Sequence, residues 1–153
     1  ELAARVAEHV RVNKADAVFV DGGGVGGGVV DRLRQLHVEV IEVNFGSKAE
    51  DVRYNNKRAE MWGNMKEWLP TGAIPTEREL TDDLIGLEYS FTPTNKVQLE
   101  KKEDMKRRGL ASPDLADALA LTFAYPVAPK GLAKDRMGKA EARRNYNPYK
   151  KKR

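Results

Sequence analysis

The chain has 153 residues, about the length of one domain. Hydrophobic residues make up 41% of it and charged residues 33%, which is typical of a soluble protein with a buried core. The sequence holds no cysteine and two histidines, which excludes a disulfide scaffold, a thiolate metal site and a cysteine nucleophile. No apolar run approaches the roughly 18 residues that span a bilayer, so we expect no membrane partner.

The net charge of +4 is unevenly distributed along the chain. Residues 1–129 carry 17 basic and 21 acidic side chains, a balance of −4. Residues 130–153 carry 10 basic and 2 acidic side chains, a balance of +8. An acidic body that ends in a basic tail favours a polyanionic partner such as nucleic acid. The tail also lacks sustained apolar periodicity, so we expect no folded element in it.

The first elements predict an α/β fold. Apolar spacing indicates an amphipathic helix over residues 1–13, and an apolar, β-rich run indicates a buried strand over 17–21. A second helix from Val29 to Leu36 and a second strand over 38–43 follow. Strand, helix and strand in this order form a βαβ unit, which favours a parallel sheet.

The rest of the chain predicts helices and one hairpin. Trp62 and Trp68 lie on an apolar stripe and are expected in the core, whereas His9 and His37 are expected to have no special role. The expected elements are a polar loop over 44–56, a helix over 57–69, a helix from a Thr76/Glu79 capping box to Ile85, a hairpin of 87–92 and 96–99, a charged helix over 100–108 ended by Gly109, and a helix that starts at Ser112-Pro113-Asp114 and runs to Tyr125.

Six glycines lie within Gly22–Gly28, directly after Asp21. Between a strand and a helix they match G-x-G-x-x-G, so a dinucleotide-binding turn is one interpretation, although Asp21 would repel a pyrophosphate. A second interpretation makes Asp21 the functional group, because a turn without side chains leaves space for metal ions or a backbone phosphate. A third is that Asp21 caps the following helix.

Asp114 and Asp117 are three residues apart in the first turn of the last helix, so they share one face. Acids at the positive end of a helix are favourable in themselves, which explains Asp114 better than Asp117. Facing Asp21, they would form an oxygen-rich site suited to Mg²⁺ or Mn²⁺. Two ions roughly 3.5–4 Å apart catalyse phosphoryl transfer, while peptidases and glycosidases also use paired acids. The basic tail favours a substrate that carries phosphate.

Basic side chains gather in residues 53–58 and 101–108. We expect most of them on solvated helix faces. On a DNA-binding protein such residues would contact phosphates, which supplies affinity without sequence preference. The candidate nucleic-acid-binding residues are Lys102, Lys106, Arg107 and Arg108.

Three segments, in this order and at these spacings, resemble the C-terminal nuclease domain of the large terminase subunit of tailed double-stranded DNA bacteriophages. They are AVFVDGGGVGGGVVDRL, NNKRAEMWGNMKEWL and LEKKEDMKRRGLASPDLADALALTFA. The resemblance covers residues 1–127 and leaves 128–153 as a basic C-terminal tail. It implies a ribonuclease H-like fold and a metal-dependent endonuclease that cuts concatemeric viral DNA with two Mg²⁺ or Mn²⁺ ions.

The resemblance also assigns roles to residues. Asp21 matches the carboxylate that ends the fourth sheet strand of the family, and Asp114 matches the acid that opens its last helix. Asp117 is a second candidate ligand beside Asp114, and all three are candidate catalytic residues. Lys102 lies where a basic residue near the site is expected.

The implied partners are double-stranded DNA, the ATPase domain of the same terminase, the small terminase subunit and the capsid portal, in the cytoplasm of the infected bacterial host. The family's first catalytic aspartate lies on a strand that would precede the helix over residues 1–13. We therefore expect a fold truncated before its first strands, with weak or no nuclease activity as this fragment. A non-catalytic DNA-binding or motor-docking module and a dinucleotide-binding domain remain the alternatives.

Overall fold

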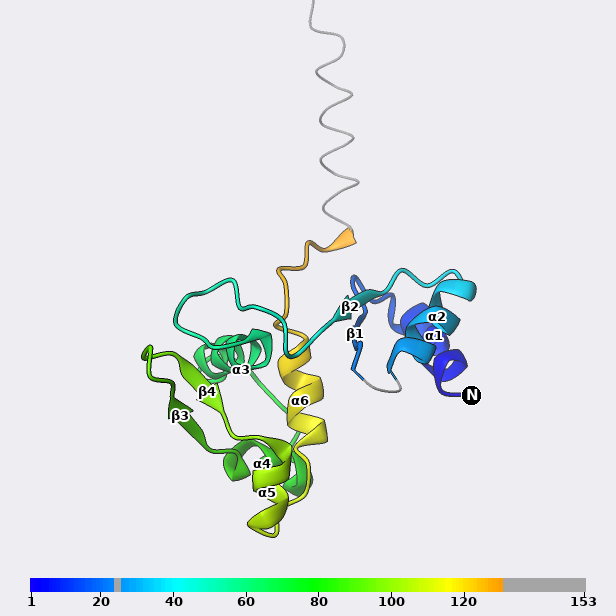
Figure 1. The fold of residues 1–153 in the computed structure, drawn as a ribbon. Helices are drawn as coiled ribbons and strands as arrows, with labels where there is room; N and C mark the ends of the chain where they lie inside the picture. Colours follow the sequence, from blue (N-terminus) through cyan, green and yellow to red (C-terminus); the bar gives the residue numbers. More distant parts are fainter. Residues whose placement is uncertain (24–25, 131–153) are drawn as a thin grey trace, which may run out of the picture.

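The computed structural model describes residues 1–23 and 26–130 (Figure 1). It confirms every expected helix and strand in the expected order, with several of them shorter than predicted. The predicted tail beyond residue 130 lies outside the described residues. The elements are α1 (Leu2–Asn13), β1 (Phe19–Asp21), α2 (Gly26–Gln35), β2 (Ile41–Val43), α3 (Lys57–Trp68), α4 (Arg78–Gly86), β3 (Tyr89–Phe91), β4 (Val97–Leu99), α5 (Lys102–Arg107) and α6 (Asp114–Leu121).

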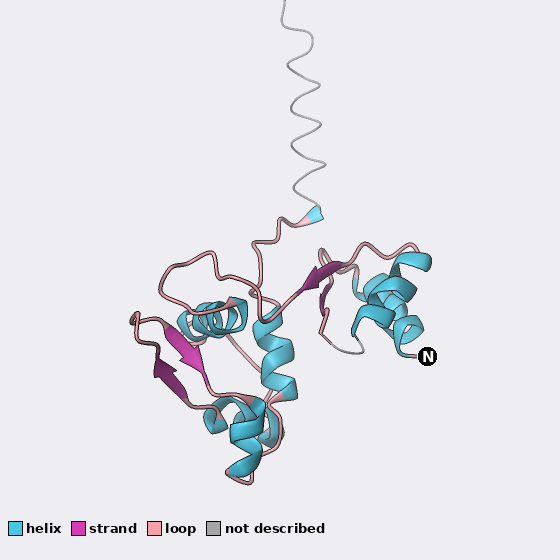
Figure 2. Ribbon diagram, viewed as in Figure 1, coloured by secondary structure: helices cyan, strands magenta, loops and turns pink. Residues whose placement is uncertain are grey.

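The N-terminal part contains the predicted βαβ unit (Figure 2). β1 and β2 pair in parallel, with Phe19 opposite Ile41 and Asp21 opposite Val43. Both strands are three residues long, shorter than predicted, because within the described residues each has only the other as a partner. α1 packs against α2. The α/β class expected from the sequence is therefore confirmed.

The glycine-rich turn brings the start of α2 against the end of β1. A Cβ on Gly26 would overlap the carbonyl oxygen of Asp21, so this close approach requires glycine. The backbone N–H of Gly22 donates to the carbonyl of Val43 at 3.0 Å and extends the pairing of the two strands by one residue. The turn thus fixes the backbone on both sides of the Asp21 carboxylate.

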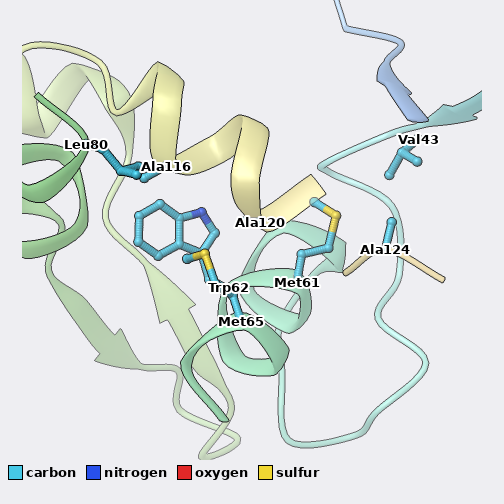
Figure 3. Packing of buried hydrophobic residues seen from close by; sticks show 8 residues of the cluster. All are labelled: Val43, Met61, Trp62, Met65, Leu80, Ala116, Ala120 and Ala124. Carbon is cyan, nitrogen blue, oxygen red and sulfur yellow. The ribbon is translucent and has the colours of Figure 1, made fainter. Parts of the chain in front are cut away.

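α3 lies at the centre of the second part. It begins at Asn56, whose side-chain oxygen accepts a hydrogen bond from the N–H of Ala59 at 3.0 Å. Together with α4 and α6 it encloses the main core (Figure 3), and Trp62 lies in it as predicted. Trp68 is half-buried against Phe123, with ring centroids 5.4 Å apart. The buried members are Val43, Met61, Trp62, Met65, Leu80, Ala116, Ala120 and Ala124.

The predicted hairpin packs against α3. β3 and β4 are antiparallel, with Tyr89 opposite Leu99 and Phe91 opposite Val97. Its turn contains Asn95 at a φ of 58°, a conformation that asparagine tolerates better than most residues. Gly109 at a φ of 79° follows α5, as expected for a residue that ends a helix.

Three expected ends of α4 and α6 were wrong. The N-cap of α4 is Glu77, with no side-chain cap, so Thr76 and Glu79 do not form a capping box. Asp114, not Pro113, is the first residue of α6. α6 also ends at Leu121 instead of Tyr125, because the next turn tightens into i→i−3 hydrogen bonds such as that from the N–H of Phe123 to the carbonyl of Ala120.

No helix in residues 1–23 and 26–130 combines the length and the apolar character needed to cross a bilayer.

Candidate functional site

Asp117 is the best-connected of the three predicted acids. It is buried in α6, with 6% of its side chain exposed. Arg58 donates to both of its oxygens, from Nε to Oδ1 at 3.0 Å and from Nη2 to Oδ2 at 3.3 Å. The indole N–H of Trp62 donates to Oδ1 at 2.8 Å, and Figure 3 shows this ring beneath α6. Burial of a carboxylate is tolerated when it is paired in this way.

Lys102 joins Asp117 to Asp114. Its Nζ lies 3.0 Å from Oδ2 of Asp117 and 3.5 Å from Oδ1 of Asp114. Asp114 itself is open to solvent, with 78% of its side chain exposed. The two acids of α6 therefore lie on one face, as predicted, but in very different surroundings. One is enclosed by donors and the other is accessible to a ligand.

Arg58 is the residue of this site that the sequence analysis missed. We expected solvated faces for most of the basic residues in 53–58 and 101–108, and Lys57 and Arg58 are exceptions, because both are buried. Lys57 pairs with the buried Glu60 at 2.7 Å. The signal was present in the spacing, since Arg58 lies four residues before Trp62 and so shares its buried face.

α6 begins against α4. Oδ2 of Asp83 accepts hydrogen bonds from the N–H groups of Leu115 at 2.9 Å and Ala116 at 3.3 Å. This carboxylate replaces the local cap that α6 lacks, because the first N–H groups of a helix need acceptors. It therefore fixes the turn that carries Asp114.

Asp21 ends β1, as predicted, and it is half-buried. Its Oδ1 accepts a hydrogen bond from the N–H of Gly23 at 3.0 Å. β1 packs against α6, and Phe19 lies near Tyr125, with ring centroids 6.1 Å apart. In Figure 1, β1 and α6 run in opposite directions.

Over residues 1–23 and 26–130, no group of three or more acidic or histidine side chains is arranged to hold a metal ion. Asp114 and Asp117 are neighbours, but the pairing partners of Asp117 occupy its two oxygens. A metal site built on Asp21 and Asp114 would thus need a further ligand beyond these two carboxylates.

Two backbone N–H groups in the described part of the glycine-rich turn already have acceptors. Binding of a pyrophosphate uses free backbone N–H groups at the start of a helix. In this turn the N–H of Gly23 already donates to Asp21 and that of Gly26 donates to the carbonyl of Gly23 at 3.1 Å. These two N–H groups are therefore not free to bind a phosphate.

The basic residues of α5 have different surroundings. Lys106 is exposed, and Arg107 is exposed with a salt bridge to Asp104 at 2.8 Å. Arg108 binds both oxygens of Glu100, at 2.8 and 2.6 Å, and the carbonyl of Gly86 at 2.9 Å. Its guanidinium therefore connects α5 to the end of α4. The hydrogen bond from Arg108 lowers the pKa of the Glu100 carboxyl below its ordinary value.

No protein-family model matches the chain, and no curated protein matches it. Several solved structures match it. Their fold defines the class of this chain: it has the ribonuclease H-like fold of terminase nuclease domains, and each of its two described sheets has two strands.

Three of the solved structures that match come from one virus. One is a lysine-to-alanine variant of gp2c of the large terminase subunit from bacteriophage Sf6, with calcium. It matches at a TM-score of 0.69 and 20% identity, over 81% of this chain and 71% of that one. A lysine-to-alanine variant of the nuclease domain with manganese matches at a TM-score of 0.66 and 22% identity, over 81% of this chain and 72% of that one. The nuclease domain without the substitution matches at a TM-score of 0.64 and 22% identity, over 82% of this chain and 72% of that one. At these identities the likeness establishes the fold.

Proposed function

We propose that the chain is the metal-dependent endonuclease domain of a viral DNA-packaging terminase and that it cuts concatemeric double-stranded DNA. The proposal rests on one observation: a half-buried carboxylate ends β1 and an exposed carboxylate begins α6, in a fold shared with terminase nuclease domains. One of those domains is described with manganese, a cation that prefers carboxylate oxygens.

The donor set fits Mg²⁺ or Mn²⁺ in part. Asp114 is exposed, and Asp21 lies beside a turn whose glycines leave room for a DNA backbone. Two bound ions would supply water activation and stabilisation of the leaving oxygen. Asp21 and Asp114 are the proposed ligands, and Asp117 holds Lys102 beside Asp114. The Lys102 ammonium can contact a DNA phosphate on the same face.

A further carboxylate would complete the site. Among the described residues, one edge of β1 has no strand partner. A strand paired in parallel to that edge would end next to Asp21, because parallel strands end at the same side of a sheet. An acid at its end would be the third ligand. With two carboxylate ligands alone, we propose that the metal is held loosely and that nuclease activity is weak.

The proposed partners are double-stranded DNA, the terminase ATPase domain, the small terminase subunit and the capsid portal, in the cytoplasm of the infected bacterium. We also propose DNA phosphate contacts from Lys106 and Arg107, which are exposed on α5. Arg108 is a weaker candidate because its guanidinium is bound to Glu100.

Titration of supercoiled plasmid with Mn²⁺ tests the proposal. We expect nicking that is lost in Asp21→Ala and in Asp114→Ala. Asp31→Ala is the matched control, because Asp31 is an exposed acid on α2, and it should nick like the unmodified chain. Metal-dependent nicking that persists in Asp114→Ala would contradict the assigned site.

A non-catalytic DNA-binding or motor-docking module is the second candidate. It is favoured by the lack of a complete three-acid group in residues 1–23 and 26–130. In the same titration it predicts DNA retention that needs no metal, weakens as salt rises, and is never accompanied by nicking.

A further inference from the structure

Arg58 connects two parts of the candidate site that are far apart in sequence. Its Nε and Nη2 bind the carboxylate of Asp117 on α6. Its Nη1 donates to the backbone carbonyl of Glu100 at 3.2 Å. Glu100 lies two residues before Lys102, the first residue of α5. One guanidinium therefore binds the acid that Lys102 contacts and also the backbone that leads into its helix.

We propose that Arg58 is a positioning residue, which neutralises Asp117 and so leaves the Lys102 ammonium shared between Asp117 and Asp114. The consequence for metal binding rests on the proposed function, because it needs Asp114 to be a ligand. The charge arrangement itself does not depend on that function.

The argument follows from burial. A buried carboxylate must be paired, and a bidentate arginine pairs it better than a single ammonium does. Because Arg58 already pairs Asp117, the Lys102 ammonium does not have to neutralise that carboxylate by itself. It lies 3.0 Å from Asp117 and 3.5 Å from Asp114. The positive charges of Arg58 and Lys102 thus balance the negative charges of Asp117 and Asp114. Removing either charge of the buried pair must move the Lys102 ammonium.

The two removals move it in opposite directions. In Arg58→Gln, Asp117 keeps only Lys102 as a cation, so the ammonium moves away from Asp114 into the buried site. In Asp117→Asn, the ammonium keeps only Asp114, which is exposed, so it moves toward solvent. A purely structural role for Arg58 and Asp117 would instead loosen the site in both variants alike.

Acetylation of lysines in the full chain, read by peptide mass spectrometry, measures this directly. The quantity is the labelling rate of Lys102 relative to that of Lys106, an exposed lysine four residues on in the same helix. We expect the ratio to fall about two- to fivefold in Arg58→Gln and to rise about two- to fivefold in Asp117→Asn, the range that an ion pair of ordinary strength gives. A rise in both variants overturns the proposal.

Two further variants keep the test decisive. Arg58→Lys retains the charge and the fold but loses the fork and the Glu100 contact, so the ratio should fall, by less than in Arg58→Gln. Asp82→Ala removes an exposed acid of α4 whose salt bridge is to Arg78, so it touches none of the four charges. Its ratio should equal that of the unmodified chain, and a change as large as in Arg58→Gln would also overturn the proposal.

Mn²⁺ binding, measured by electron paramagnetic resonance, adds the functional consequence. We expect Arg58→Gln to bind Mn²⁺ about two- to fivefold more tightly and Asp117→Asn to bind it more weakly by a similar factor. Weaker binding in Arg58→Gln, where Asp114 should be released from Lys102, contradicts the inferred role. If no variant binds Mn²⁺ while the labelling ratios move as expected, the positioning role stands and the proposed metal site fails.

Discussion

The parts of the chain before and after β2 are stabilised differently, although each supplies a candidate metal ligand. Seven of the eight residues in the main core lie in α3, α4, α6 and the turn that follows α6, with Val43 as the exception. In α1 only Ala3 is buried, and in α2 Val30 and Leu33 are. A groove of about 1030 Å³ runs along the first part, and both apolar residues such as Val18 and Val38 and charged residues such as Arg11 line it.

Because of this difference, the two candidate metal ligands, Asp114 and Asp21, are held in position by different kinds of contact. Asp114 is positioned by a packed helix, by the Asp83 cap and by the charges around Asp117. Asp21 is positioned by a three-residue strand that pairs on one side within the described residues. The position of Asp114 is therefore set by contacts within the described chain, whereas that of Asp21 would be made firmer by a further strand on β1.

The largest effect should come from removing the buried acid of the second part. Asp117→Ala leaves Arg58 buried without its partner and should lower the free energy of unfolding by about 3–5 kcal/mol. Asp114→Ala removes an exposed side chain and should change it by less than about 0.5 kcal/mol. Urea unfolding followed by tryptophan fluorescence measures both. Equal losses would contradict the contrast between an enclosed and an accessible acid.

A core truncation in each part comes next. Leu33 and Met61 are both fully buried, so truncation to alanine should cost about 2–5 kcal/mol locally. Because few buried residues connect the first part to the main core, we expect Leu33→Ala to lower hydrogen-exchange protection mainly in residues 1–43. Met61→Ala should lower it throughout the described chain. The same global loss in both variants would mean that the two parts unfold as one unit.

The smallest effect concerns the contact that connects α5 to α4. The bond from Arg108 lowers the pKa of Glu100 below the ordinary value of 4.5, so this pair adds stability above that pH. The contribution is lost as the pH falls through the lowered folded-state pKa. The stability difference between the unmodified chain and Arg108→Met should thus be present at about pH 6 and shrink toward about pH 3. A difference that grows in acid would contradict this assignment.

The sequence was sufficient for the order and type of the elements. Apolar spacing and glycine or proline punctuation act locally, so the helix ended by Gly109 and the hairpin around Asn95 could be predicted from neighbouring residues alone. Asp21 and Asp114 were found for the same reason, since each stands at the end of an element with a clear local signal. Whether these two carboxylates share metal ions stays a prediction.

Contacts between distant segments could not be read from local patterns. The cap of α6 comes from Asp83 on another helix, which no capping rule within the segment would find. The burial of Arg58 depends on Asp117, and neither residue signals the other along the sequence. The spacing of apolar residues indicated which face of α3 is buried. It did not indicate that this face also carries buried charged side chains such as Arg58.

The hydrogen bonds that hold α6 also determine when the candidate site can form. Asp83 and Leu115 are 32 residues apart, and Arg58 and Asp117 are 59 residues apart. Contacts of such separation require long loops to close first, and chains rich in them fold slowly. The acids of α6 thus gain their final surroundings only after α3 and α4 have docked. A ligand that needs this arrangement will therefore bind the completed fold and not a folding intermediate.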